Sequence, residues 1–243
     1  MNYILILGAN SDIAKAVASE YAKHGHYLYL AARNSKSLDG FANDLQIRYT
    51  IKATPIEFNA IQYDKHHVFY KNLPVKPIGV VCAIGYLGDQ KKAQSKFSEV
   101  QEIIQANFVG NVSILNIIAN DFEQTKAGFI IGISSVAGER GRKNNYFYAS
   151  AKAAFSCYLS GLRNRLYTNN VQVLTVKPGF VETKMTGKMN LPKILTAQPE
   201  AVAKDIYNAQ IKGKNIIYSK RIWYFIMKII KSIPEFQFKK MEF

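Results

Sequence analysis

The chain of 243 residues contains only two cysteines, Cys82 and Cys157, both in apolar surroundings. Two such residues do not make a disulfide framework, so we expect a reducing, cytoplasmic environment. No run of 18 uncharged apolar residues is present, and we therefore expect no membrane-spanning helix. The first apolar segment begins almost at Met1 with no basic region before it, so a signal peptide is not expected.

Linkers, repeats and acidic residues are also scarce. No Pro-, Gly- or Ser-rich stretch divides the chain, which predicts one domain over residues 1–243. Only 17 Asp and Glu oppose 32 Lys and Arg, so the net charge is +15. A basic surface attracts nucleic acid, anionic lipid or a phosphorylated substrate, although a solvated lysine-rich surface has the same composition. Because no nucleic-acid recognition motif accompanies the charge, we expect no nucleic-acid partner, and we also expect no metal site.

Strand-like and helix-like segments alternate along the chain. The expected strands are Tyr3–Leu7, Tyr27–Ala31, Tyr49–Ile56, Ile78–Ala83, Gly128–Ile133, Val171–Val176 and Asn215–Tyr218. The expected helices are Ser11–His24, Lys36–Leu45, Ile61–Tyr70, Phe97–Asp121, Tyr148–Tyr167 and Glu200–Ile211. Continuous apolar strands suit a parallel sheet buried on both faces. The pattern predicts an α/β fold, namely a Rossmann-like doubly wound sheet of about seven strands with helices on both faces. The polar segment after Gly179 is a candidate lid.

The turn after the first strand keeps one glycine of a dinucleotide-binding fingerprint. Gly8 is present, but Asp12 and Ala14 occupy the positions of the second and third glycines. Gly8 permits a tight turn, Ser11 or Asp12 can cap the next helix, and the free amides of that helix attract an anion. Ala14 is small enough for close packing of helix on strand. The carboxylate of Asp12 would repel a pyrophosphate, so we expect it to point away from one.

The second strand ends without the carboxylate that holds the ribose hydroxyls of NAD. The sequence there is Ala32 followed by Arg33. An arginine can stack on adenine and pair with a 2′-phosphate, which favours NADPH over NADH, although an arginine after a strand is also a common surface residue.

A tyrosine and a lysine four residues apart carry the strongest chemical signal. Tyr148 and Lys152 share one face of the expected helix, and Ser135 ends the strand before it. We expect the ammonium to lower the pKa of the phenol, so that Tyr148 transfers a proton near neutral pH. The Ser135 hydroxyl is placed to bind the carbonyl oxygen that receives this proton.

Through GANSDIA, AARN, CAIG, ISS, YASAK and KPGFVET, together with Asn107, the chain resembles the short-chain dehydrogenase/reductase family over nearly its whole length. The resemblance implies the catalytic set Asn107, Ser135, Tyr148 and Lys152. It implies hydride transfer between nicotinamide and a carbonyl carbon, with Tyr148 as acid or base. Lys152 would also bind the nicotinamide ribose, and Asn107 would hold a water that relays protons to it.

The cofactor-binding residues follow from the loop and from the resemblance together. They are Gly8, Asn10, Ser11, Asp12, Ile13, Arg33, Asn34, Asn59, Ala83, Gly85, Lys152, Pro178, Gly179, Val181 and Thr183. Asn59 replaces an aspartate that is common in the family, and Cys82-Ala83-Ile84 stands where many members have Asn-Asn-Ala. These departures concern cofactor affinity and leave the catalytic set intact.

Segments around the catalytic helix and in the tail resemble one branch of the family, which includes a reductase of a keto-pentose carried on decaprenyl phosphate. Arg140, Arg142 and Lys143 lie between Ser135 and Tyr148, in a segment that borders the substrate in this fold. Since arginine pairs bidentately with phosphate, we expect Arg140 and Arg142, with Asn145, to bind substrate. A solvated loop or a subunit contact is the alternative.

Residues 220–243 form a basic amphipathic tail. Arg221, Lys228 and Lys231 fall on one stripe of an otherwise apolar helix, which suits a membrane interface. The alternative is a helix that packs on the domain or on a partner subunit.

The sequence therefore predicts an NADPH-dependent carbonyl reductase that acts on a keto-sugar linked to a polyprenyl phosphate, for cell-envelope polysaccharide synthesis. Reduction of a fatty or other apolar ketone is the alternative within the same class. A non-catalytic nucleotide-binding protein is a third hypothesis, which the intact catalytic set opposes. We expect a homo-oligomer, a flavin-dependent oxidase as the partner that supplies the ketone, and a cytoplasmic location at the inner face of the cell membrane.

Overall fold

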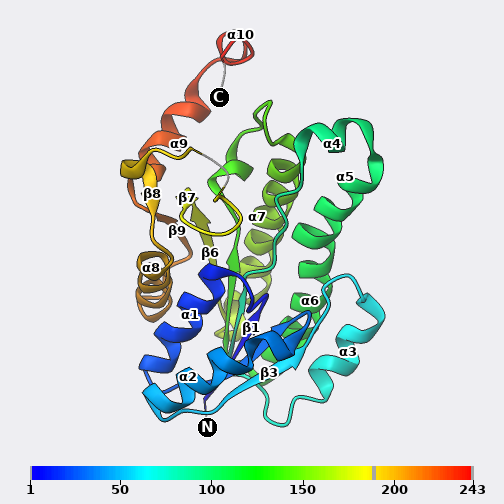
Figure 1. Ribbon diagram of the computed structural model, residues 1–243, viewed down its shortest axis with the longest axis vertical. Coiled ribbons are helices and arrows are strands. Elements are labelled where there is room, and N and C mark those ends of the chain that lie inside the picture. The colour runs from blue at the N-terminus through cyan, green and yellow to red at the C-terminus, as the bar shows by residue number, and fades with distance from the viewer. Residues whose placement is uncertain (1, 188–189, 242–243) are drawn as a thin grey trace.

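The computed structural model describes residues 2–187 and 190–241, so Met1 and the last two residues of the expected domain and tail lie outside it (Figure 1). Seven strands form a parallel sheet in the order β3-β2-β1-β4-β5-β6-β9. Their bounds are β1 Tyr3–Leu7, β2 Tyr27–Ala32, β3 Ala53–Glu57, β4 Gly79–Cys82, β5 Phe129–Ile133, β6 Gln172–Pro178 and β9 Ile216–Ser219. The strand order reverses between β1 and β4, as in a Rossmann fold, which confirms the expected fold class.

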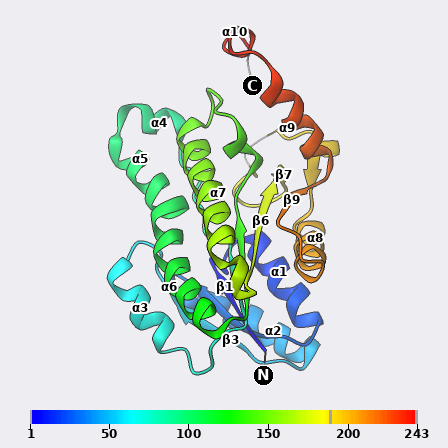
Figure 2. The ribbon, with the colours of Figure 1, turned by 180° about the vertical axis from the view of Figure 1, so that it is seen from behind.

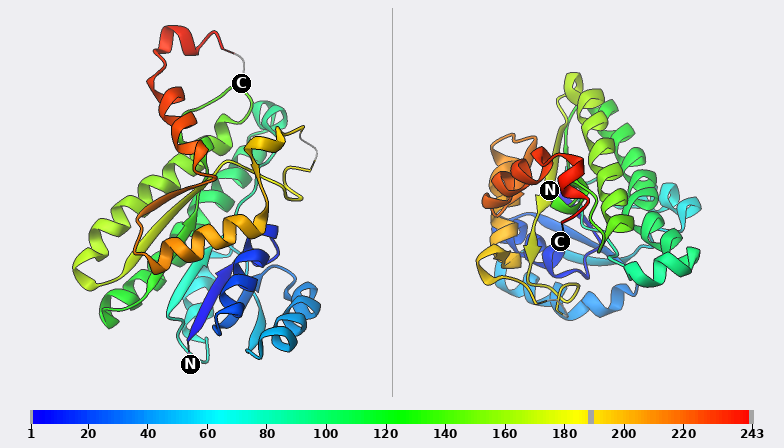
Figure 3. Two further views of the ribbon diagram at one scale, coloured as in Figure 1. Left: turned by 90° about the vertical axis from the view of Figure 1, so that its left-hand side faces the viewer. Right: turned by 90° about the horizontal axis from the view of Figure 1, so that it is seen from above.

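Helices cover both faces of the sheet, as Figures 1 and 2 show from opposite sides and Figure 3 shows from above. One layer contains α1 Asp12–Lys23, α2 Asp39–Tyr49 and α8 Pro199–Ile211, and the other contains α3 Tyr63–Lys71, α6 Gly110–Thr125 and α7 Tyr146–Leu166. Alternate residues of β1 enter the two cores: Ile4 and Ile6 face the first layer, and Leu5 and Leu7 face the second. The sheet is thus buried on both faces, which explains its uninterrupted apolar strands.

One strand and one helix differ most from the sequence prediction. The expected strand Tyr49–Ile56 begins too early, because α2 continues to Tyr49 and ends at Thr50 in a left-handed conformation with φ 54°. The expected helix Phe97–Asp121 is in fact three segments: α5 Phe97–Ile104, a π-helical turn Gln105–Val109, and α6. Single π turns interrupt α-helices most often at functional sites.

The continuous helical stretch Phe97–Thr125 is long and apolar enough to cross a membrane by length and composition. Its inner face, however, is part of the core, since Ile114, Leu115 and Ile118 are fully buried against the sheet and α7. It packs as the central helix of this fold.

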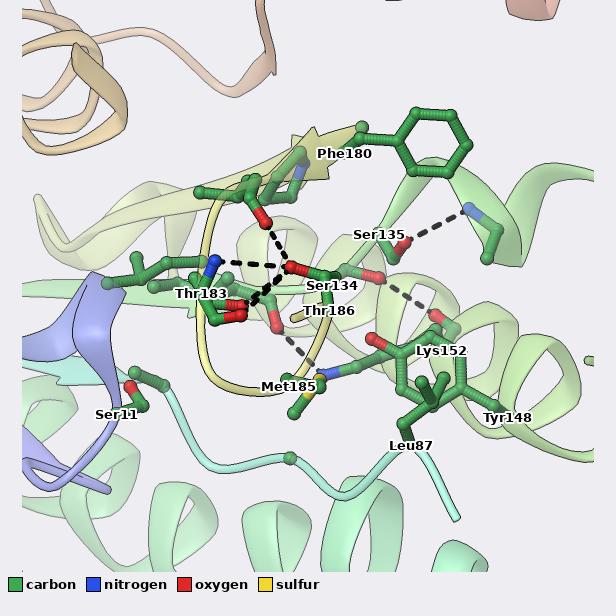
Figure 4. A pocket seen from close by; sticks show the side chains of 18 of the residues that line it. Ser11, Leu87, Ser134, Ser135, Tyr148, Lys152, Phe180, Thr183, Met185 and Thr186 are labelled. Atoms are coloured by element: carbon green, nitrogen blue, oxygen red, sulfur yellow. Dashed lines mark hydrogen bonds between the residues drawn. The ribbon is translucent and has the colours of Figure 1, made fainter. Parts of the chain in front are cut away.

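The chain after β6 rises above the carboxyl edge of the sheet (Figure 3). A two-stranded sheet pairs β7 Phe180–Val181 with β8 Thr196–Ala197, and this sheet was not predicted. The segment 182–187 between them, which we name the strap, lies over the carboxyl ends of the central strands (Figure 4). After β9 the chain forms α9 Ile222–Ser232 and α10 Glu235–Phe238, while the unpredicted α4 Gln90–Ser95 precedes α5.

Candidate active site

A cavity of about 330 Å³ opens at the carboxyl ends of β1, β4, β5 and β6, beside the point where the strand order reverses. Open α/β sheets bind their ligands at this place. The lining comes from the β1–α1 turn, the segment after β4, the β5–α7 connection, the strap and α9. The predicted residues that line it are Asn10, Ser11, Asp12, Ile13, Ala83, Gly85, Ser135, Arg142, Asn145, Tyr148, Lys152, Pro178, Gly179, Val181 and Thr183.

The turn between β1 and α1 has the geometry that the sequence predicted. Gly8 has φ +81°, and a Cβ there would lie 3.0 Å from the backbone of Ala83 and Ile84. The residue must therefore be glycine for two reasons, its conformation and the close approach of the β4 end. Ser11 caps α1, since its Oγ accepts a hydrogen bond of 3.1 Å from the amide of Ala14. The amide groups of this first turn face the cavity edge, where an anion is stabilised.

A second cavity continues from the first toward β2. It is lined by Gly8, Asn10, Ser11, Ala32, Arg33, Phe58, Ala60, Ala83, Ile84 and Gly85. The backbone that carries Arg33 is fixed by polar contacts: Asn10 Nδ2 donates to the Arg33 carbonyl at 3.0 Å, and Glu57 accepts from the amides of Asn34 and Ser35. These amide hydrogen bonds hold the pKa of Glu57 below its usual range. The backbone on both sides of the Arg33 side chain is thus held by neighbouring polar groups.

Two predicted cofactor residues line neither cavity. Asn34 is in the left-handed conformation with φ 54° and donates its amide to Glu57. The side-chain Oδ1 of Asn59 accepts a hydrogen bond from the amide of Ile61. The backbone carbonyl oxygen of Asn59 lies 3.1 Å from His66 Nε2. Their contact with a cofactor stays a prediction.

Tyr148 and Lys152 project from the first turns of α7 into the cavity, and Ser135 faces them from the end of β5 (Figure 4). Lys152 is 3% exposed, and its Nζ donates to the Ile133 carbonyl at 3.0 Å. The start of α7 is tied to β5 through Ser134, whose Oγ donates to the carbonyl of Lys152. The structure thus brings the predicted residues Ser135, Tyr148 and Lys152 together at one cavity.

The electrostatics of this group differ from the sequence prediction. We expected Lys152 to lower the pKa of Tyr148, but burial raises it to about 12, and only the hydrogen bond with Ser135 acts in the opposite direction. Burial also lowers the pKa of Lys152 to about 8. The ammonium points at the Ile133 carbonyl and lies 5.7 Å from the centre of the Tyr148 ring, so desolvation outweighs its attraction for a phenolate. A phenol that keeps its proton is suited to act as an acid.

Asn107 lies in the π-helical turn and is fully buried. Its Nδ2 donates to the carbonyls of Tyr86 and Ile103, and its Oδ1 accepts from the Tyr86 amide. A Cβ on Gly85 would lie 3.1 Å from Asn107 Oδ1 and 3.3 Å from Lys152 Nζ. Asn107 therefore fixes the segment after β4 beside the lysine, whereas its expected contact with a water stays a prediction.

Asp12 has a role that the sequence did not suggest. Its Oδ2 accepts a hydrogen bond of 2.8 Å from the amide of Lys184 in the strap. The strap is itself closed by Thr186, whose Oγ1 donates to the Val181 carbonyl and accepts from the Thr183 amide. The carboxylate that seemed out of place in a phosphate-binding turn thus anchors the segment that covers the cavity.

Arg140 does not reach the cavity, which corrects its assignment as a substrate-binding residue. Its guanidinium donates to the carbonyls of Ile230 and Ile233 at the end of α9, pairs with Glu235 and lies over the ring of Phe238. Cations at a helix C-terminus stabilise it. The neighbouring Glu139 binds Lys177, Tyr218 and Lys231.

The tail helix packs on the domain with one face and exposes the other. Trp223, Met227 and Ile230 are buried against Val136 and Phe180. The three basic residues of the expected stripe are all exposed, but Lys231 pairs with the buried Glu139.

Several lining residues escaped the sequence analysis, above all Trp223. Its Nε1 donates to the Leu195 carbonyl at 3.0 Å, and its ring lies directly over Gly179, where a Cβ would come within 1.9 Å of it. The other unpredicted lining residues are Ile84, Leu87, Ile133, Ser134, Val136, Ala137, Phe180, Lys184, Met185, Thr186, Ala32, Phe58 and Ala60. These side chains are mostly apolar and carry no motif.

The chain is similar to known short chain dehydrogenases. The model of that family matches residues 2–193. An uncharacterized oxidoreductase of Mycobacterium tuberculosis is 32% identical over 241 residues, which are 98% of this chain and 96% of that protein. A short-chain dehydrogenase from Sphingobium yanoikuyae in complex with NADPH has the same fold, with a TM-score of 0.83 at 18% identity over 97% of both chains. So does a bulky-bulky ketone specific alcohol dehydrogenase from Comamonas testosteroni, with a TM-score of 0.80 at 17% identity over 97% of this chain and 96% of the other. The chain therefore belongs to the short-chain dehydrogenase family, a family of oxidoreductases.

Proposed function

We propose that this protein is an NADPH-dependent carbonyl reductase. The observation that carries the proposal is the convergence of Tyr148, Lys152 and Ser135 on one cavity at the carboxyl edge of the sheet. That cavity continues into a second one that ends at Arg33. Proton-transfer groups next to an extended cleft of this kind suit a reaction between a small carbonyl compound and a dinucleotide.

The residues present fit NADPH. The capped N-terminus of α1 is placed for the pyrophosphate, Arg33 for the 2′-phosphate, and Gly85 leaves space beside Lys152 that a side chain would fill. The structural neighbour from Sphingobium yanoikuyae, which is described in complex with NADPH, supports this choice. When bound, NADPH supplies the hydride for the carbonyl carbon.

The side chains of the site supply the proton and hold the oxygen. Tyr148, with a pKa raised to about 12, stays protonated at neutral pH and donates its proton to the developing alkoxide. The Ser135 hydroxyl, which accepts from the Ala137 amide, is fixed beside it and donates to the same oxygen. Lys152, whose pKa is lowered to about 8, is the nearby ammonium that would return a proton to Tyr148 after the transfer.

Replacement of Tyr148 by Phe tests this role. We expect kcat to fall by about 1000-fold, within the usual range of general acid catalysis, while the Kd for NADPH changes by less than about threefold. Tyr146→Phe, at the exposed start of the same helix, is the matched control and should keep its turnover. Unchanged turnover in Tyr148→Phe would refute Tyr148 as the proton donor, whereas a wild type that binds NADPH but reduces none of the ketones would favour a non-catalytic nucleotide-binding protein.

For the substrate, we favour a keto-sugar on a polyprenyl phosphate, reduced for cell-envelope polysaccharide synthesis after a flavin-dependent oxidase has formed the ketone. The support is the meeting of polar and apolar groups in one cavity, Arg142 and Asn145 on one side and Leu87, Phe180 and Trp223 on the other. The second candidate is a fatty or other apolar ketone, which the same apolar walls favour. The ketone-specific neighbour from Comamonas testosteroni is an analogy for it. Product analysis with both substrate types separates the two, and turnover of apolar ketones alone would refute the keto-sugar.

We also propose peripheral attachment to the cytoplasmic face of the membrane through α9. Ile222, Phe225 and Ile229 are exposed on the face opposite Trp223, and Phe236 of α10 is exposed near them in sequence. The basic residues Arg221 and Lys228 flank this face and suit anionic lipid. Because the opposite face of α9 forms the cavity wall, this arrangement brings a lipid-borne substrate to the site.

Point variants test attachment better than truncation does, since removal of α9 would also remove the buried Trp223. Phe225→Asp with Ile229→Asp should reduce sedimentation with phosphatidylglycerol vesicles by about tenfold or more. Ile47→Asp, at an exposed isoleucine on α2, is the control. Equal binding of all variants would contradict the proposal. The expected homo-oligomer and the expected lack of a nucleic-acid partner remain predictions.

A further inference from the structure

We infer that Arg142 and Asn145 form a subsite for an oxyanion on the substrate itself, so that the enzyme selects ketones that carry a phosphate or carboxylate near the carbonyl. The inference rests on the proposed reductase function and adds a charge requirement to it. Both residues lie in the connection between β5 and α7, and both line the cavity that holds Tyr148.

The first observation is a guanidinium without a counterion. Arg142 Nε is buried and has no hydrogen-bond partner among residues 2–187 and 190–241, and no carboxylate in those ranges forms an ion pair with it. Burial accordingly lowers its pKa. Buried charged groups in proteins are normally paired, because removal of an ion from water is unfavourable unless a partner compensates it. An anion from outside the chain would meet this requirement.

The lack of a counterion is particular to Arg142, as a comparison with Arg140 shows. The two arginines are two residues apart, and Arg140 has two backbone carbonyls, a carboxylate and an aromatic ring as partners. The loop therefore directs one guanidinium to the protein and the other to the cavity.

The second observation concerns Asn145, the residue just before α7. Asparagine at this position usually accepts a hydrogen bond from the first turn of its helix. Here the side chain makes no capping bond, and its Oδ1 is buried without a partner in the described part of the chain. The amide thus offers an acceptor to a hydroxyl of the ligand, three residues from Arg142 and three from Tyr148.

The apolar lining of the cavity strengthens the expected ion pair between Arg142 and an oxyanion. The cavity walls opposite are Leu87, Val136, Phe180, Met185 and Trp223. An apolar lining excludes water, so a guanidinium and an oxyanion attract each other more strongly than they would at the surface. The cofactor phosphate has its own arginine, since Arg33 lines the second cavity and Arg142 the first. The ligand that fits Arg142 is therefore an acidic, hydroxylated ketone.

Matched neutral and anionic ketones test the inference. Trp223 is the only tryptophan of the chain and lines the same cavity, so quenching of its fluorescence reports binding without turnover. The first pair is dihydroxyacetone phosphate with dihydroxyacetone, and the second is 4-oxopentanoate with 4-oxopentanamide, each titrated with and without NADP⁺. The wild type should bind the anionic member at least about tenfold more tightly, which corresponds to one charge-assisted hydrogen bond. The pair with the larger ratio identifies the oxyanion as phosphate or carboxylate.

In Arg142→Gln the ratio between anionic and neutral ligand should fall to about one, and Arg142→Lys should restore part of it. Arg48→Gln, at an exposed arginine paired with Asp44, is the control and should keep the wild-type ratio. Equal affinity for both members in the wild type, or a ratio that survives in Arg142→Gln, would overturn the subsite. Fluorescence quenching measures binding without turnover, so its result does not depend on the Tyr148→Phe experiment. Failure of the reductase proposal and failure of the anion subsite would therefore be recognised separately.

Discussion

The two cavities at the carboxyl edge are built in different ways. The one beside Arg33 is assembled from residues 8–60 and 83–85, and its polar groups hold each other: Asn10 bonds the Arg33 carbonyl, and Glu57 bonds two amides. The one beside Tyr148 combines the β1–α1 turn, the segment after β4, the β5–α7 connection, the strap and α9, and among the described residues Arg142 Nε and Asn145 Oδ1 have no hydrogen-bond partner there. The polar groups of the cavity beside Arg33 are thus bonded to one another, whereas two polar groups of the cavity beside Tyr148 remain open to a ligand.

Among changes outside the catalytic set, the largest effect should come from Gly179→Ala, which disrupts the contact between the end of β6 and α9. In Gly179→Ala the added Cβ would meet the Trp223 indole at 1.9 Å, so the ring and its bond to the Leu195 carbonyl must move. We expect the free energy of unfolding to fall by about 2–4 kcal/mol and kcat/KM to fall by about 100-fold or more. Denaturant unfolding and steady-state kinetics measure the two effects.

Gly161→Ala is the control for this change, because nothing lies within 4 Å of that added Cβ in α7. This variant should gain about 0.5–1 kcal/mol of stability through helix propensity. Wild-type stability and kinetics in Gly179→Ala would mean that Trp223 does not form the wall.

A smaller effect, on the choice between NADPH and NADH, should be confined to the cavity beside Arg33. Arg33→Asp exchanges a cation for a carboxylate where a 2′-phosphate would bind, so the preference for NADPH over NADH should fall by about 10- to 100-fold. Calorimetric titration of both cofactors measures it. If the wild type binds NADH as well as NADPH, the interpretation of Arg33 is wrong.

The smallest effect is a pH dependence that should belong to the Tyr148 cavity alone. Lys152, with a pKa of about 8, is an ammonium below that pH and loses its proton above it, whereas Tyr148, with a pKa of about 12, stays protonated. The kcat/KM for reduction should therefore be constant below pH 8 and decrease about tenfold per pH unit above it. NADPH binding at Arg33 should not follow this profile. A descending limb that begins only above pH 10 would contradict the lowered pKa of Lys152.

The same contrast explains how far the sequence was informative. The Gly8 turn, the Ser11 cap, Arg33 and the pair Tyr148 and Lys152 were predictable, since each depends on neighbours a few residues away. The position of Arg140 was not predictable, because it depends on where residues 230–235 return to the domain. Arg142, in contrast, lines the cavity where the sequence analysis expected a substrate. The raised pKa of Tyr148 also could not be predicted, since spacing shows that an ammonium is near but not how deeply the phenol is buried. Trp223 and Gly179 meet across 44 residues and have no shared motif.

The hydrogen bond between Asp12 and the Lys184 amide ties the strap to the first turn of α1. Asp12 is the first residue of α1, where the cofactor phosphates are expected, and both residues line the cavity beside Tyr148. An outward movement of the strap would have to break this contact between segments 172 residues apart in the chain. The cover of the proposed carbonyl site is thereby fastened to the helix end proposed for the cofactor, so that a displacement of one would also displace the other.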